Sequence, residues 1–121
     1  MFPEEYIKGG EDWLRAGRRR FLLLNVIYYL QNFAGKENGV GKEDISEFLE
    51  ALREVNMEMY LSIIKPKIPL EATLNELLSD GLIVEMDEGK YGVNKEKIKS
   101  EKDLIYWRGA KRILDNVNQK M

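Results

Sequence analysis

Residues 69–93 constrain the fold more than any other part of the chain, because they encode a helix, a turn and a hairpin in direct succession. Four leucines recur at helical spacing and place one apolar stripe on a helix of about three turns. They are Leu70, Leu74, Leu77 and Leu78. Pro69 suits the first position of this helix, where its missing N–H group would be unpaired anyway. Gly81 follows the helix and is the residue type that most readily adopts the left-handed turn that ends one.

A strand-turn-strand pattern comes next. Residues 82–84 (Leu-Ile-Val) form an apolar run, residues 87–90 (Asp-Glu-Gly-Lys) are typical of a turn, and residues 91–93 (Tyr-Gly-Val) can form the return strand. The sequence therefore predicts a β-hairpin over about Leu82 to Val93, directly after the helix.

This layout resembles the winged helix-turn-helix superfamily, in which a recognition helix precedes a hairpin wing. The residues that carry the resemblance lie within 70–93. They are Leu74, Leu77, Gly81, Leu82, Ile83, Gly89, Lys90, Tyr91 and Val93. The resemblance implies a mainly α (α+β) fold with a small β-hairpin wing and a long C-terminal helix. It restricts function less, because one fold carries many functions and winged helices bind DNA, RNA and other proteins.

Residues 11–94 are expected to form the winged-helix domain, after a flexible N-terminal segment at residues 1–10. A first helix from about Glu11 to Asn32 or Phe33 is apolar nearly all round, as expected of a central, buried helix. Val40 can supply a short first strand.

A second helix is expected to begin at Gly41 or Lys42, with its apolar stripe facing the core. The apolar residues of 55–65 recur at helical spacing, so either the second helix continues or a separate helix follows. The prolines at 66 and 69 must end it. The winged-helix resemblance implies a tight turn here, so this stretch is an insertion of roughly ten residues that departs from the standard helix-turn-helix geometry.

Residues 95–121 are predicted to form a final helix from about Lys95 to Asn118. Its apolar stripe consists of Leu104, Trp107, Leu114, Val117 and Met121, of which the first four are the predicted dimer contacts. The resemblance to PadR-like and MarR-like regulators implies that this helix pairs across a two-fold axis, giving a homodimer. The alternative is that the helix folds back onto the first helix of its own chain.

Composition excludes most catalytic chemistry. The chain contains no cysteine and no histidine, which removes disulfides, thiolate nucleophiles, Ser-His-Asp catalysis and nearly every zinc site. Its carboxylates occur in no glycine-rich or metal-ligand pattern. We therefore expect no enzyme activity, no catalytic residues, no metal and no cofactor.

With 121 residues the chain is long enough for one domain with a proper core. No apolar run approaches the roughly 20 residues that cross a bilayer, and the start does not resemble a signal peptide. We expect a cytoplasmic protein that does not enter the membrane.

The resemblance also implies a DNA-binding surface. In the usual docking, the exposed face of the recognition helix enters the major groove. Asn75 can pair with an adenine edge there, and Ser79 can bond a phosphate. The predicted contacts are Lys65, Lys67, Asn75, Ser79 and Lys90, with Arg18, Arg19 and Arg20 as backbone anchors. The alternative for the arginines is a solvated basic turn.

The charge distribution leaves two functions open. Residues 35–94 contain 6 Lys/Arg and 13 Asp/Glu, whereas residues 95–121 contain 8 and 4. Glu71 and Glu76 on the recognition helix would repel phosphates, which supply most non-specific affinity. The chain is thus expected to be a transcription regulator that binds double-stranded DNA. The alternative is a protein-interaction module with an acidic recognition face and no strong DNA binding.

Overall fold

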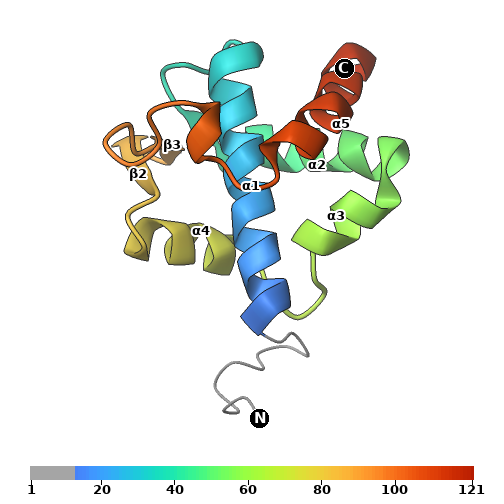
Figure 1. Ribbon diagram of the computed structural model, residues 1–121, viewed down its shortest axis with the longest axis horizontal. Helices are drawn as coiled ribbons and strands as arrows, with labels where there is room; N and C mark the ends of the chain where they lie inside the picture. Colours follow the sequence, from blue (N-terminus) through green and yellow to red (C-terminus); the bar gives the residue numbers. More distant parts are fainter. Residues whose placement is uncertain (1–12) are drawn as a thin grey trace.

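The computed structural model describes residues 13–121, with side chains from residue 17 onward. Within these residues the chain is mainly helical, with a small three-stranded antiparallel sheet, as predicted. The elements in chain order (Figure 1) are α1 (Trp13–Phe33), β1 (Val40–Gly41), α2 (Lys42–Val55), α3 (Met57–Ile63), α4 (Leu70–Ser79), β2 (Ile83–Asp87), β3 (Lys90–Val93), the 3₁₀ helix η2 (Glu101–Asp103) and α5 (Trp107–Lys120). The segment predicted to be flexible, residues 1–10, lies outside the described residues.

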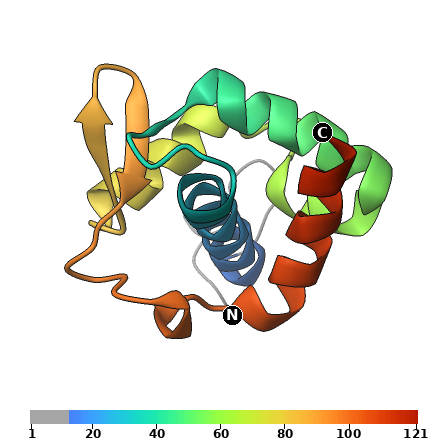
Figure 2. The ribbon, with the colours of Figure 1, turned by 90° about the horizontal axis from the view of Figure 1, so that it is seen from above.

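Helix α1 is the centre of the molecule. Figure 2 looks nearly along it and shows the other helices and the sheet arranged around it. Leu23, Val26 and Ile27 are completely buried, and helices α3, α4 and α5 as well as β3 pack against α1. The prediction of a central helix is confirmed, because a helix that is apolar on every side must be covered on every side.

The predicted hairpin is also confirmed. Strand β3 lies between β1 and β2, with Val40 opposite Tyr91 and Ile83 opposite Val93. The hairpin is attached to the central helix by Gln31, whose Oε1 accepts a hydrogen bond of 2.8 Å from the backbone N–H of Val93.

Helix α3 is separate from α2. Asn56 ends α2 in an extended conformation, and its side-chain oxygen accepts from the N–H of Met59 at 2.9 Å. A side chain that satisfies a free N–H in this way starts a new helix. Of the two alternatives for residues 55–65, the separate helix is therefore the observed one.

Helix α4 ends where the sequence predicts, and it begins one residue later than the predicted first position at Pro69. It starts at Leu70, with Pro69 one position earlier at the N-cap. Gly81 follows with a φ of 74°, the left-handed conformation that favours glycine.

The predicted start of the last helix near Lys95 is wrong, because α5 begins only at Trp107. Three hydrogen bonds hold the preceding segment in an irregular path. The Asp103 carboxylate accepts from the backbone N–H groups of Lys99 and Ser100, and Asn25 of α1 donates to the carbonyl of Ile105 at 2.8 Å. Tyr106 then adopts a left-handed φ of 73°, which a continuous helix does not allow.

The four residues predicted to form a dimer interface are buried within their own chain. Leu104 and Trp107 are nearly covered and Leu114 and Val117 completely so, in the same core as Leu77. Helix α5 packs against α1 and α2, which is the alternative that the sequence left open. The two predicted units, 11–94 and 95–121, share one core, and a homodimer requires a different surface.

The leucine stripe of α4 gives a direct test of the core. Replacing the fully buried Leu77 with alanine is expected to lower the free energy of unfolding by about 2–5 kcal/mol, because it removes apolar contacts and leaves a cavity. Val84→Ala, on the exposed side of β2, is the control and should change it by less than about 0.5 kcal/mol. Equal urea midpoints for the two variants would contradict the packing described.

A tyrosine–aspartate–lysine chain joins α5 to α1. The hydroxyl of Tyr29 donates to Asp115 Oδ1 at 2.6 Å, and Lys111 Nζ lies 2.8 Å from Asp115 Oδ2. The hydrogen bond from Lys111 and then that from Tyr29 hold the pKa of Asp115 below its ordinary value of 3.8. Burial, followed by the bond to Asp115, raises the pKa of Tyr29.

The hydrogen bonds among Tyr29, Asp115 and Lys111 predict an acid-sensitive contribution to stability. Because the pKa of Asp115 is depressed on folding, its contribution is present above its unfolded pKa and is lost as the pH falls through the lower, folded pKa. Between about pH 6 and pH 2.5, Asp115→Asn should therefore lose less stability than the wild type. Thermal melts across this range test the difference. Identical losses would show that Asp115 contributes nothing.

Candidate nucleic-acid interface

Helix α4 presents a polar outer face. Its inner side is anchored by Leu74 and Leu77 against α1 and β2. The outer side carries Glu71, Asn75 and Ser79, which are exposed and lie four residues apart, along one line of the helix.

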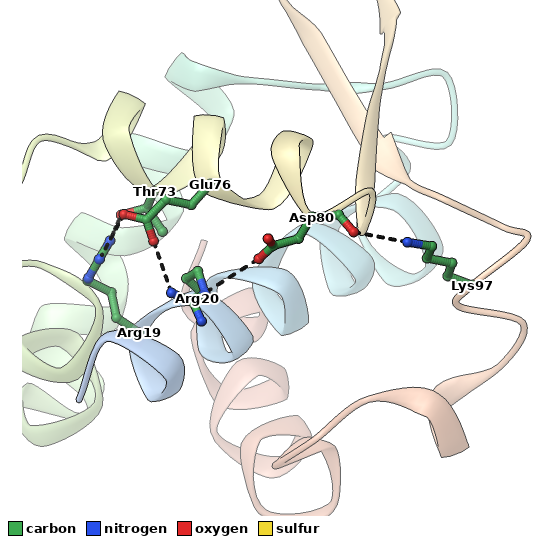
Figure 3. A network of polar contacts seen from close by, with 6 residues as sticks. All are labelled: Arg19, Arg20, Thr73, Glu76, Asp80 and Lys97. Carbon is green, nitrogen blue, oxygen red and sulfur yellow. Dashed lines mark hydrogen bonds and ion pairs between the residues drawn. The ribbon is translucent and has the colours of Figure 1, made fainter. Parts of the chain in front are cut away.

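Arginines from α1 hold the remaining polar side of α4 (Figure 3). The guanidinium of Arg19 is buried; it donates to the hydroxyl of Thr73 and lies 3.4 Å from the Glu76 carboxylate. Arg20 approaches the other oxygen of Glu76 at 3.2 Å and the Asp80 carboxylate at 3.7 Å. Glu76 is therefore held between two cations.

The other charges of α4 are also matched. Lys42 lies 2.9 Å from the Glu71 carboxylate, and Arg20 is the cation nearest the Asp80 carboxylate. Lys97 donates separately to the backbone carbonyl of Asp80 at 3.0 Å. The hydrogen bond to Glu71 raises the pKa of Lys42. All three carboxylates of α4 and its C-cap thus have a cationic partner. This balance is invisible in the sequence, because each partner comes from a distant segment.

The Arg18–Arg20 triplet, predicted to anchor phosphates, is divided among different roles. Successive helix residues point in directions about 100° apart. Arg19 therefore faces inward, and a phosphate contact by it is ruled out by its burial. Arg20 is engaged with Glu76 and Asp80, while Arg18 is exposed toward α3.

The remaining predicted contacts lie around α4. Lys65 and Lys67 belong to the segment that leads into it, where Lys65 pairs with Ile68 in a tight turn. Lys67, Asn75, Ser79 and Lys90 are exposed and Lys65 is half-buried. The hairpin beside them is acidic, with exposed carboxylates at Glu85, Asp87 and Glu88.

A lysine-rich segment was missed as a candidate. Residues 95–102 carry Lys95, Lys97, Lys99 and Lys102, all exposed. Lys97 reaches the C-terminal end of α4 through Asp80, so the segment starts beside the candidate interface. The excess of positive charge in residues 95–121 was the signal, but the predicted continuous helix gave no reason to place it near α4.

Comparison of the chain with protein-family models, with curated proteins and with solved structures found no match. None of the helices in the described part is both long enough and apolar enough to cross a membrane.

The Arg19–Glu76 contact predicts a stability difference between two otherwise similar substitutions. Glu76→Gln removes the charge that faces the buried Arg19 and should lower the free energy of unfolding by about 1–3 kcal/mol. Glu71→Gln removes an exposed pair with Lys42 and should change stability little, since solvent screens such pairs. Guanidinium titrations measure both variants, and equal effects would contradict the assigned role of Glu76.

Proposed function

We propose that the chain is a winged-helix protein that binds double-stranded DNA and acts as a transcription regulator, with α4 as its recognition helix and β2–β3 as its wing. The element order and the β1–β3–β2 sheet support this assignment, and α3 is an insertion ahead of α4. The observation that carries the proposal is the neutralised, polar outer face of α4.

The first support is electrostatic. An acidic recognition helix would be repelled by phosphates, which was the main argument against DNA binding. Arg19 and Arg20 neutralise Glu76 from inside, and Lys42 pairs with Glu71. Helix α4 can therefore approach a charged groove at a much lower electrostatic cost than its sequence suggests.

The second support is the chemistry of the outer face. Protein interfaces are usually anchored by buried aromatic, aliphatic or arginine side chains. The outer line of α4 has none of these and instead offers Asn75 and Ser79. Asparagine can bind the N6 and N7 atoms of adenine with two hydrogen bonds in the major groove. This face suits a hydrated groove better than an apolar protein surface.

The third support is the supply of phosphate contacts. Lys65 and Lys67 precede α4, and Lys90 belongs to the wing. Residues 95–102 begin near the C-terminal end of α4. Lysine contacts to phosphate give affinity without sequence preference and make binding salt-dependent.

The acidic hairpin favours the second candidate, a protein-interaction module. Glu85, Asp87 and Glu88 are exposed and have no ion pair among the described residues. They would repel a DNA backbone near the wing and would suit a basic protein surface. In this form of the alternative the wing is the contact surface, whereas the sequence predicted the acidic face of the recognition helix.

Two substitutions test DNA recognition. After selection of a preferred site from random duplexes, Asn75→Ala should cost about 1–3 kcal/mol on that site and little on random DNA. Lys67→Gln should weaken binding similarly on every duplex and reduce the salt dependence by about one contact. Fluorescence anisotropy at several salt concentrations measures both effects.

The control is Lys120→Gln, at the far end of α5, which should leave affinity unchanged. Absence of binding to the whole duplex pool at about 50 mM salt would overturn the DNA proposal, because non-specific affinity is greatest at low salt. Equal losses from Asn75→Ala on selected and random duplexes would show that α4 does not read the sequence.

A further inference from the structure

We infer that a second copy of this chain docks on a groove between α3 and the neighbouring ends of α1 and α5. Two adjoining hollows, of about 400 and 270 Å³, form this α3 groove and share Arg18, Glu58 and Ser62 on their walls. The inference goes beyond the proposed function and does not depend on it.

The α3 groove is apolar at its floor and along its edges. Leu22, Met59 and Ala110 line the floor. At the edges, Leu61 of α3 is 50% exposed and Tyr106, before α5, is 45% exposed. Leaving large apolar side chains in water forgoes about 25 cal/mol per Å² of burial. A partner that covers them would recover it.

Exposed apolar side chains are frequent on the elements that border the groove, and two of them, Leu61 and Tyr106, line it. Eight large apolar side chains are exposed in the described part of the chain, and four of them belong to α3 or to the turn before α5. They are Met57, Leu61, Ile105 and Tyr106. The turn is not a loose loop, because the buried Asn25 holds the Ile105 carbonyl and so fixes the outward position of this pair.

The charges at the groove identify a second copy as the partner. A two-fold interface contacts itself, so each charge must find its opposite within the same patch. Arg18 and Glu58 line both hollows and Lys65 lines the smaller one, and none of the three has an ion pair with another described residue. A two-fold axis between them would place Arg18 of one copy opposite Glu58 of the other. A nucleic acid would instead require cations without the carboxylate or the exposed leucine.

The position of the groove is compatible with the candidate DNA surface. Both ribbon views place α3 and α5 on one side of α1, and α4 with the hairpin on the other (Figures 1 and 2). Pairing through the groove therefore leaves both copies of α4 uncovered; of the candidate phosphate contacts, only Lys65 lines the groove. This surface replaces the stripe of α5, which its own chain covers.

Sedimentation velocity on the full chain without DNA tests the pairing. The wild type should form dimers between about 5 and 200 µM in a concentration-dependent manner. Leu61→Lys should raise the dissociation constant at least about tenfold by placing a charge in the apolar contact. Val84→Lys, at a comparably exposed residue on β2, should leave it unchanged. Circular dichroism confirms that each variant is folded.

Two variants with exchanged charges separate a loss of pairing from a general destabilisation of the fold. Arg18→Glu gives a chain with acids at both positions 18 and 58, and Glu58→Arg gives one with bases at both positions beside Lys65, so each alone should be monomeric. A one-to-one mixture should form heterodimers, because both cross-interface pairs between positions 18 and 58 are then of opposite sign. A monomeric wild type at 200 µM, equal effects of Leu61→Lys and Val84→Lys, or a mixture that stays monomeric would each overturn the inference. A monomer that still binds DNA overturns only the pairing, and a dimer that does not bind DNA overturns only the proposed function.

Discussion

The buried guanidinium of Arg19 determines how α4 lies on the molecule. A charge that is removed from water must be paired and hydrogen-bonded, or the fold is penalised heavily. Thr73 and Glu76 meet this requirement, so the side of α4 that carries them must face α1. Once the helix is rotated in this way, its geometry turns Asn75 and Ser79 toward solvent. The candidate recognition face is therefore a consequence of a buried ionic contact in the core.

The same contact relates stability to the proposed activity. Because Glu76 is committed to Arg19 and Arg20, the acidic composition of residues 35–94 does not translate into an acidic α4. Three carboxylates that have no ion pair with a described residue lie together on the hairpin, at Glu85, Asp87 and Glu88. The relative strength of the charges on α4 and on the hairpin decides between a DNA-binding helix and a protein-binding wing.

Local patterns predicted the parts of the fold that local physics controls. The leucine spacing and Gly81 placed α4 and its end, the strand-turn-strand pattern placed the hairpin, and the apolar character of α1 indicated its central position. The start of α5 could not be predicted, since it depends on the contact of Asn25 with Ile105, 80 residues apart in sequence. The roles of Arg19 and Arg20 were missed for the same reason. A run of arginines looks like a phosphate site until its distant carboxylates are known.

The stripe of α5 illustrates a related limit. An amphipathic helix shows that a partner exists but not whether that partner is its own chain or a second copy. Here its own α1 and α2 cover the stripe, and the surface left uncovered lies at Leu61 and Tyr106. Only the arrangement of the helices shows which apolar residues remain exposed.

The proposed function depends most on α4 being the surface that meets DNA. Titration of ¹⁵N-labelled protein with duplex DNA, followed by amide and side-chain chemical shifts, tests this residue by residue. We predict that the largest shifts fall on residues 65–79, including the side-chain amide of Asn75, and extend to Lys90 and to residues 95–102. Shifts confined to the α3 groove, or the absence of shifts at the outer face of α4 when DNA is bound, would contradict the account.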